Sequence, residues 1–369
     1  LGIRQVRTIR ATIERDGLLA DLEAIGATVL ANACGPCIGQ WERSKDITSK
    51  PNTIVNSFNR NFPRRNDGSA NTLSFVTSPD TVIALALAGR LDFDPIIDTI
   101  TAPDGTVVRL EPPRGEILPA RGYDSGKNTF IAPPADGSAI QVVVSPSSDR
   151  LQLLHAFPAW DGKDYLELPV LMKARGKCTT DHISAAGKWL TYRGHLENIS
   201  GNLFAGVVNA FTGMAGGGLD ILDGTARPFP EIAKRYSIAG VRWCAVGDQN
   251  YGEGSSREHA AMEPRYRGGV VILARSFARI HETNLKKQGL CATYVCRTRI
   301  RTISSVNATP SACSGYRRCQ KKPVRCVINK PYGTTIEFEA LHTFSAEQVE
   351  WFKAGSALNV VRQKLSATR

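Results

Sequence analysis

The 369-residue chain lacks any run of about 18 consecutive apolar residues, the length that a membrane-spanning helix needs. Nine cysteines are too few for a disulfide framework in a chain this long, which favours a reducing compartment. The sequence also has no long lysine and arginine run and no basic stripe interleaved with aromatic residues, the usual signs of nucleic-acid binding. These absences argue against a membrane, a secreted disulfide scaffold and a nucleic acid as the partner, and we expect a monomer.

The composition is that of an ordinary globular protein, with 42% hydrophobic and 22% charged residues. The length allows two or three domains, each with its own core. The net charge is +12, so the surface would attract acidic metabolites.

Short strands and helices alternate along the first 90 residues, which predicts an α/β domain. Ser78 is a predicted helix N-cap, Pro79 occupies the first helical position and Gly89 ends the helix. We expect helices over residues 12–25 and 79–88, and strands over 27–30 and 53–56.

Six prolines between residues 112 and 149 predict an extended linker. We therefore expect a first domain over residues 1–125, a linker over 126–150 and a second domain over 151–369. In the second domain the expected strands cover residues 166–174, 241–246 and 269–274, and the expected helix covers 256–262.

Residues 291–320 do not fit this pattern, because they contain no acidic residue and their apolar residues show no period. The segment holds Cys291, Cys296, Cys313 and Cys319, but their spacing lacks the paired CxxC form of a zinc site. We interpret the segment as a disordered loop, or as an aberrant stretch produced by a frameshift or splice error.

Cys34 and Cys37 form a CxxC motif around Gly35-Pro36, a turn that could point both sulfurs the same way. Four interpretations of such a motif are open: a redox dithiol, half of a zinc site, two ligands of an iron–sulfur cluster, or two buried thiols without a role. No second CxxC follows at zinc spacing. An iron–sulfur cluster with a third ligand from outside the motif is the preferred interpretation.

Asn59, Arg60 and Arg65 follow the second expected strand. Two guanidinium groups on one loop suit a di- or tricarboxylate, because each binds a carboxylate through two hydrogen bonds. The alternative is that both arginines are exposed surface charges.

Asp181 precedes His182 in a loop after an expected strand, and Arg193 follows eleven residues after His182. Asp181 could orient His182 in a proton relay, or it could simply cap a turn.

The segment 252–258 has glycines at 252 and 254, and Ser255 is followed by Glu258 at the spacing of a capping box. A helix start here would offer free N–H groups to an anion and stabilise an ionised serine hydroxyl. A dinucleotide loop is a weaker alternative, because Arg257 replaces the third glycine of that motif. A plain helix cap without a function also remains open.

Taken together, these segments resemble the aconitase family, most closely its mitochondrial members. The matching stretches are residues 9–17, 30–41, 52–67, 161–164, 176–187, 193–202, 247–264, 276–290 and 344–359. The likeness covers most of the chain except residues 291–320.

The resemblance implies a partial three-layer α/β/α domain, a linker and a swivelling domain of mixed β and α structure. It implies a mitochondrial matrix hydro-lyase of the tricarboxylic acid cycle that converts citrate to isocitrate through cis-aconitate on a 4Fe–4S cluster. The family's residue roles carry over to this sequence by motif. Cys34 and Cys37 would be cluster ligands with Asn59 near the cluster, and the substrate carboxylates would be bound by Arg60, Arg65, Arg193 and Arg257. Ser255 would be the base, Ser256 would bind the substrate and Asp181 would assist the proton chemistry.

The chain departs from the family pattern in one important respect. The family's third cluster cysteine lies in an earlier segment that has no counterpart here, so the chain resembles the C-terminal half of an aconitase and is expected to be inactive alone. The alternatives are a related hydro-lyase for homocitrate or homoaconitate, and a non-catalytic relative that binds RNA.

Overall fold

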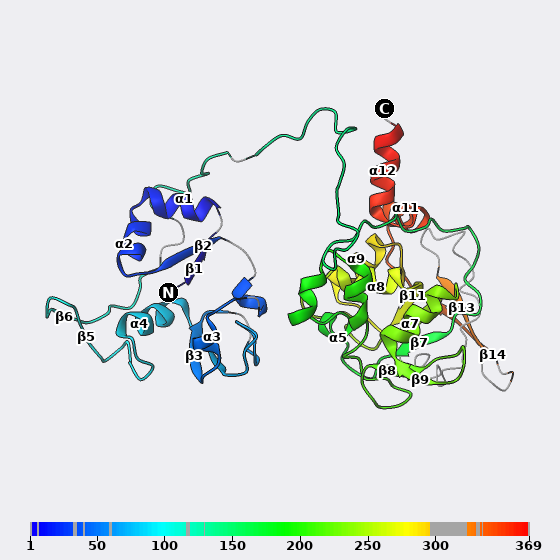
Figure 1. Cartoon of the computed structure of the whole chain (residues 1–369), viewed down its shortest axis with the longest axis horizontal. Coiled ribbons are helices and arrows are strands. Elements are labelled where there is room, and N and C mark those ends of the chain that lie inside the picture. The colour runs from blue at the N-terminus through cyan, green and yellow to red at the C-terminus, as the bar shows by residue number, and fades with distance from the viewer. Residues whose placement is uncertain are drawn as a thin grey trace. The chain divides into compact units, whose positions relative to one another are not determined.

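The computed structural model describes residues 2–5, 7–31, 35–39, 41–58, 61–115, 119–128, 130–295, 323–329, 333 and 335–367. The chain divides into two compact units, Leu1–Gln141 and Val142–Arg369 (Figure 1). Both contain helices and parallel strand pairs, so the fold is mixed α/β. Among the described residues, no helix is both long and apolar enough to cross a membrane.

The first unit opens with a parallel pair of strands joined by two helices. Strand β1 (Gly2–Gln5) pairs with β2 (Thr28–Ala31), and α1 (Arg7–Arg15) and α2 (Leu18–Ala24) lie between them in sequence. The expected single helix over residues 12–25 is therefore wrong. Gly17 adopts a left-handed conformation with φ of 82°, which an α-helix cannot contain, so the chain breaks there.

A second parallel pair follows, β3 (Asn52–Asn56) with β4 (Thr72–Val76). The sequence predicted β3 but missed β4. The predicted limits of helix α4 (Pro79–Ala88) are confirmed. The Ser78 hydroxyl accepts a hydrogen bond from the Thr81 N–H at 3.4 Å, and Gly89 ends the helix with φ of 68°.

The smaller elements of the first unit are the 3₁₀ turn η1 (Gly35–Ile38), α3 (Lys45–Thr48) and the short hairpin of β5 (Ile100–Thr101) and β6 (Val107–Val108). From residue 109 to residue 150 the described residues form no helix or strand.

The second unit is built on a four-stranded parallel sheet with the order β12-β11-β10-β7. Its strands are β7 (Val170–Lys173), β10 (Trp243–Val246), β11 (Gly269–Ala274) and β12 (Cys291–Tyr294). Helix α8 (His259–Tyr266) connects β10 to β11, and α9 (Arg279–Lys287) connects β11 to β12. The limits predicted for β11 are confirmed, whereas β7 is shorter than the expected 166–174.

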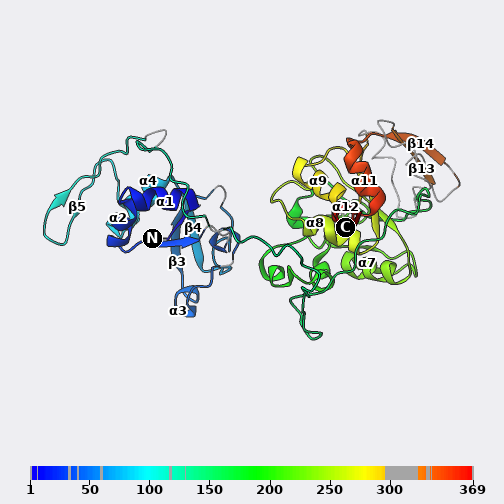
Figure 2. The same cartoon turned by 90° about the horizontal axis from the view of Figure 1, so that it is seen from above.

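The core lies on both faces of this sheet, because successive side chains of each strand point to opposite sides. Ala245 and Ile272 pack with helices α8, α9 and α7 (Phe229–Ile238) on one face. Cys244 and Val271 pack on the other face with β13 (Val324–Asn329), β14 (Thr335–Ala340) and α11 (Ala346–Ala354), and α12 (Ala357–Ala367) packs on α11 and α9 (Figures 1 and 2).

Strand β12 corrects part of the interpretation of residues 291–320. Cys291–Tyr294 is a regular edge strand, paired in parallel with β11, and Cys291 is 2% exposed. These residues are therefore part of the core rather than a disordered or aberrant stretch. Cys296, Cys313 and Cys319 lie outside the described residues.

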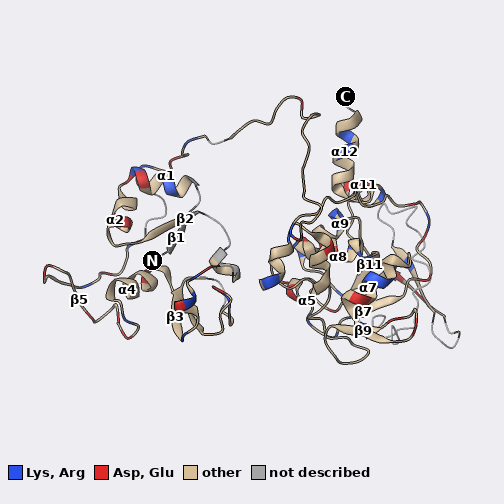
Figure 3. Ribbon diagram, in the orientation of Figure 1, with Lys and Arg blue, Asp and Glu red and all other residues tan. Residues whose placement is uncertain are grey.

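The chain between β7 and β10 forms a series of short elements. They are α5 (Thr180–Ile183), η2 (Gly187–Tyr192), α6 (Leu196–Ile199), η3 (Ser200–Asn202) and the antiparallel pair β8 (Gly217–Leu219) and β9 (Ala226–Pro228). Asp220, which is 0% exposed, accepts hydrogen bonds from Arg227 at 3.2 Å and Arg235 at 2.5 Å and so ties this segment to α7, where acidic and basic residues lie together (Figure 3).

Replacing Ile272 by Ala is expected to lower the free energy of unfolding of the second unit by about 2–5 kcal/mol, because a fully buried side chain at the sheet centre is lost. Ile238→Ala is the matched control, since Ile238 is 78% exposed at the end of α7, and its effect should stay within about 0.5 kcal/mol. Urea denaturation followed by tryptophan fluorescence measures both, and equal losses would contradict the described core.

Candidate active site

The loop that follows β10 is docked onto α5 by main-chain hydrogen bonds. The Thr180 N–H donates to the Glu253 carbonyl at 2.9 Å, and the Gly252 N–H donates to the Cys178 carbonyl at 2.8 Å. The Thr180 hydroxyl also donates to the Ser255 carbonyl at 3.0 Å. These bonds hold residues 252–255 beside α5, at the carboxyl edge of the sheet, where ligands bind in parallel α/β folds.

Arg257 is the charged centre of this region. Its Nη1 donates to Asp181 Oδ1 and, at 3.0 Å, to the Ser184 carbonyl. The Arg257 side chain is 17% exposed and that of Asp181 is 51% exposed. Two acceptors on one nitrogen fix the orientation of the guanidinium plane and leave its other donors for a ligand.

The predicted relay between Asp181 and His182 is not formed, because Asp181 pairs with Arg257 instead. His182 has a local role: its Nδ1 accepts a hydrogen bond from the Thr179 N–H at 3.2 Å, while the Thr179 hydroxyl accepts from the His182 N–H at 3.2 Å. This reciprocal pair caps the start of α5. The capping role that sequence offered to Asp181 therefore belongs to Thr179 and His182.

The predicted capping box of Ser255 and Glu258 is also wrong. Helix α8 begins at His259, and its N-cap is Glu258, which makes no side-chain capping bond. Gly254 has φ of 117°, and the Ser255 carbonyl is bound by Arg257 N–H at 2.8 Å and by the Thr180 hydroxyl. Docking onto α5 thus holds Ser255 and Ser256 in an exposed loop ahead of the helix.

Arg193 is exposed and lies near the same helix start. The His259 Nε2, in the first turn of α8, lies 2.9 Å from the Arg193 carbonyl. One end of the second unit therefore gathers five of the predicted site residues: Asp181, Arg193, Ser255, Ser256 and Arg257.

A pocket of about 430 Å³ opens beside this loop. It is lined by Thr180, Gly252, Gly254, Ser255, Ser256, Arg257, Ala278, Arg279, Ile280, His281 and Asn284. Sequence reasoning missed the last five of these residues, which come from α9 and the turn before it. The stretch 276–290 carried part of the family resemblance, but no local pattern singled out His281.

His281 forms part of the pocket wall and is 2% exposed. A Cβ atom on Gly252 would come within 2.1 Å of its ring, so only glycine fits opposite it. Neither ring nitrogen has a hydrogen-bond partner within the described part of the chain. Burial lowers the pKa of His281 to about 4, and the ring is therefore neutral at pH 7.

In the first unit, Arg65 lies against the turn that carries Cys37. Its Nε donates to the Cys37 carbonyl at 3.3 Å, and its guanidinium lies 5.1 Å from the Phe58 ring and 5.5 Å from the Phe62 ring. Arg65 is only 6% exposed, so it is not the solvated surface charge that the alternative interpretation required. Cys34, Asn59 and Arg60 lie outside the described residues.

The described donors fit part of a cluster site. Cys37 is half-buried in the 3₁₀ turn η1, next to a cationic side chain, and thiolates are the usual ligands of iron–sulfur clusters. Over the described ranges no three His, Cys, Asp or Glu side chains come close enough together to hold a metal ion. Cys37 is thus a suitable single ligand that needs partners from other residues.

Comparison with known proteins gives two family-model matches and many close relatives. The model for the aconitase family (aconitate hydratase) matches residues 6–89, and that for the aconitase C-terminal domain matches 168–294. The chain is 51% identical over 357 residues to the mitochondrial aconitate hydratase of Emericella nidulans and 50% identical over 364 residues to that of Saccharomyces cerevisiae. It is 51% identical over 363 residues to the probable mitochondrial aconitate hydratase of Caenorhabditis elegans. The chain belongs to the aconitase family.

These alignments cover 96–98% of the chain but only 45–46% of each of the three aconitase relatives, so the chain spans about half of their length. All ten predicted site residues fall inside the two matched ranges. The solved 3-isopropylmalate dehydratase of Methanocaldococcus jannaschii aligns with 55% of the chain and 98% of its own, at 16% identity and a TM-score of 0.33.

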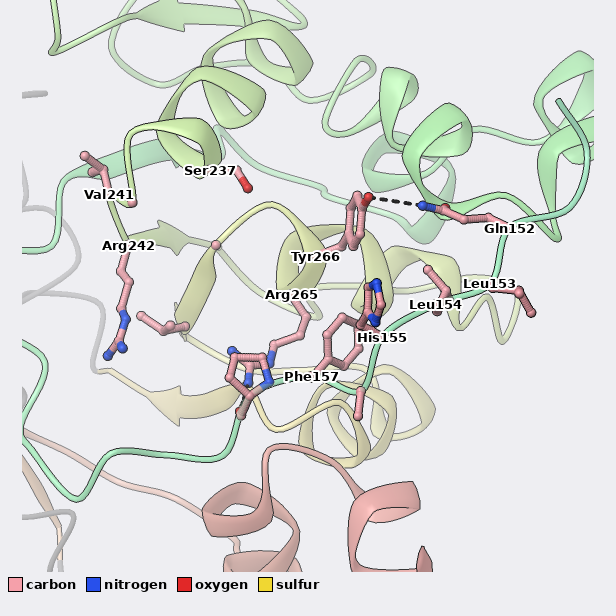
Figure 4. A pocket seen from close by; sticks show the side chains of 15 residues that line it. Gln152, Leu153, Leu154, His155, Phe157, Ser237, Val241, Arg242, Arg265 and Tyr266 are labelled. Carbon is pink, nitrogen blue, oxygen red and sulfur yellow. Dashed lines mark hydrogen bonds between the residues drawn. The ribbon is translucent and has the colours of Figure 1, made fainter. Parts of the chain in front are cut away.

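A second pocket, of about 360 Å³, lies at the opposite end of the sheet, near the starts of β10 and β11 (Figure 4). It contains two arginines that already have partners. Arg265 donates to the Pro158 carbonyl at 2.8 Å and stacks on Phe157, and Arg242 pairs with Asp161 at 3.3 Å. None of the ten site residues predicted from sequence lines this pocket, so the pocket beside Arg257 is the candidate site.

Replacing His281 by Gln is expected to flatten the dependence of stability on pH. The pKa of His281 is about 4 in the folded chain and about 6.5 when unfolded, so acid protonates the unfolded state first and destabilises the fold as pH falls below 6.5. Between pH 7 and pH 5 the native chain should lose about 2 kcal/mol more unfolding free energy than His281→Gln.

Urea denaturation at pH 7, 6 and 5 measures this difference. The control is His155→Gln, because His155 is exposed, and its pH dependence should follow that of the native chain. Parallel profiles for the native chain and His281→Gln would contradict a buried neutral imidazole.

Proposed function

We propose that the chain is the part of a mitochondrial matrix aconitate hydratase that carries two cluster cysteines and four substrate-binding arginines. The reaction is the isomerisation of citrate to isocitrate through cis-aconitate, a step of the tricarboxylic acid cycle. The observation that carries the proposal is the pocket beside Ser255, Ser256 and Arg257, with Arg257 oriented by Asp181 and the Ser184 carbonyl.

The substrate would be held as a trianion by guanidinium groups. Within the second unit the candidate groups are Arg257 and Arg193, and the family motif separately offers Arg60 and Arg65 as candidates. Guanidinium groups bind carboxylates through paired, charge-assisted hydrogen bonds, and the net charge of +12 favours the approach of an anion. Asp181 offsets one positive charge and keeps Arg257 in one orientation when no substrate is bound.

Ser255 is the proposed base. Its side chain is exposed beside the pocket, so the oxygen can reach a substrate carbon without displacing core residues. In its ionised form it would accept the proton from the carbon next to a carboxylate while the hydroxyl group leaves from the neighbouring carbon. Arg257, two residues away, would stabilise both the alkoxide and the carboxylate, and Ser256 would bind the substrate.

Cys34 and Cys37 are the proposed ligands for a 4Fe–4S cluster, with a third cysteine from outside this sequence and Asn59 nearby. When bound, the cluster supplies Lewis-acid chemistry at the substrate hydroxyl and carboxylate. The first unit of the chain contributes Arg65, which lies against the Cys37 turn and so couples the cluster ligand to a carboxylate-binding group.

Arg257→Gln should weaken the binding of propane-1,2,3-tricarboxylate to this chain by about 10- to 100-fold, because a charge-assisted contact is lost and Asp181 is left as an uncompensated anion. Arg242→Gln is the control, since Arg242 lies at the other end of the sheet, and it should change the affinity by less than about twofold. Isothermal titration calorimetry at fixed ionic strength measures both. Equal affinities for Arg257→Gln and the native chain would remove the proposed carboxylate site.

Reconstitution of this chain with iron and sulfide is expected to give little turnover of citrate, because two cysteines leave the cluster without its third ligand. The cluster's visible absorption and citrate consumption should be measured together. If the chain alone turns over citrate about as fast as a full-length aconitase, the proposal that it lacks the third cluster ligand is wrong.

A further inference from the structure

Glu263 is a fully buried acid that the proposed reaction does not use. It lies in the second half of α8 and is 0% exposed. The Ser184 hydroxyl donates to its Oε1 at 2.6 Å, and its Oε2 has no hydrogen-bond partner among the described residues. Arg267, whose positive charge acts on Glu263, is itself bound to the Glu197 carboxylate at 2.9 Å and to the Glu197 carbonyl at 3.1 Å.

Ser184 connects Glu263 to Arg257 through its side-chain hydroxyl and its main-chain carbonyl. Its hydroxyl binds Glu263, and its carbonyl accepts the 3.0 Å hydrogen bond from Arg257. Ser184 is also the residue at which α5 ends, and α5 carries Asp181, the other partner of Arg257. Any shift of Ser184 would therefore move both acceptors that orient the Arg257 guanidinium.

One face of α8 binds both ends of residues 184–193. Glu263 follows His259 by four residues, a spacing that places both side chains on the same side of a helix. His259 contacts the carbonyl of Arg193, and Glu263 contacts Ser184. The two residues thus bind the two ends of residues 184–193.

We infer that Glu263 is a positioning residue for Arg257: its hydrogen bond to Ser184 braces α5 against α8 and fixes the two acceptors that hold the guanidinium at the pocket. Burial raises the pKa of Glu263 well above its usual range, which favours the neutral carboxyl group, and its Oε1 accepts the hydrogen bond from Ser184. This role as a substrate-orienting brace rests on the proposed function, but the brace itself does not.

The test compares three substitutions in the full 369-residue chain. Ser184→Ala removes only the hydroxyl and keeps the carbonyl, Glu263→Leu removes the acceptor, and Glu263→Gln keeps a neutral acceptor of the same shape. Val324→Ala is the stability control, because Val324 is 1% exposed in the core on the sheet face away from α8.

The first measurement needs no ligand. Side-chain NMR of Arg257, assigned by the loss of its signals in Arg257→Lys, reports rotation of the guanidinium group. We expect rotation to be faster by about tenfold in Ser184→Ala and Glu263→Leu, and unchanged in Glu263→Gln and Val324→Ala. Unchanged rotation in Ser184→Ala, the smallest change, would overturn the brace even if Glu263→Leu does not fold.

The second measurement is the affinity for propane-1,2,3-tricarboxylate by calorimetry, together with the melting temperature. Ser184→Ala and Glu263→Leu should weaken binding by about 3- to 10-fold, with Glu263→Gln close to the native chain. Equal weakening by Val324→Ala at a matched loss of melting temperature would show a general stability effect and overturn the inference. So would a Glu263→Gln chain that behaves like Glu263→Leu.

The two measurements separate the inference from the proposed function. A native chain that does not bind the tricarboxylate would refute the proposed carboxylate site. Arg257 rotation would still decide whether Glu263 and Ser184 position the guanidinium.

Discussion

The parallel pairing of β7, β10 and β11 is the constraint on which the described site depends. Parallel strands end at the same edge of a sheet, so the loops after β7 and β10 leave the core side by side although about 70 residues separate them. That proximity lets Thr180 bind the main chain at Glu253 and Ser255. The sheet therefore brings Asp181 and Arg257 into contact although they are far apart in the sequence.

The sheet holds this arrangement firmly because both of its faces are covered. Ala245 and Ile272 face the helices, while Cys244 and Val271 face the β13–β14 hairpin and α11, and all four are at most 1% exposed. The pocket edge is therefore anchored to a close-packed core. The loop from Gly252 to Arg257 takes its shape from α5 on one side and from the His281 ring on the other.

The charged side chains at the site are paired even when no ligand is bound. Arg257 is mostly buried, and an unpaired guanidinium there would be costly, so Asp181 and the Ser184 carbonyl satisfy it in the absence of a ligand. Asp181 is half exposed, so the proposed carboxylate ligand would reach the same donor from the solvent side. The same principle holds for Arg65, which is buried between two phenyl rings but bound to the Cys37 carbonyl.

Much of the chain could be predicted from sequence wherever one local signal decided the structure. Ser78, Pro79 and Gly89 specify α4 because capping, φ restriction and left-handed termination act within a few residues. The apolar run of β11 specifies a strand buried on both faces, and the motifs around Cys37, Arg65, Asp181 and Ser255 pointed to the family whose models match the chain. The single helix expected over residues 12–25 failed for a local reason, because Gly17 takes a left-handed conformation. The N-cap expected at Ser255 failed because of a distant partner, since the Thr180 hydroxyl of α5 binds the Ser255 carbonyl.

The sequence by itself therefore determined the family, the α/β class and which side chains are candidates for the chemistry, since those properties depend on residue type and short spacings. Only the tertiary structure decided that Asp181 pairs with Arg257 rather than with His182, that His281 lines the pocket, and that Glu263 binds Ser184. Such pairings depend on how strands far apart in the chain are aligned, and no local pattern encodes that alignment.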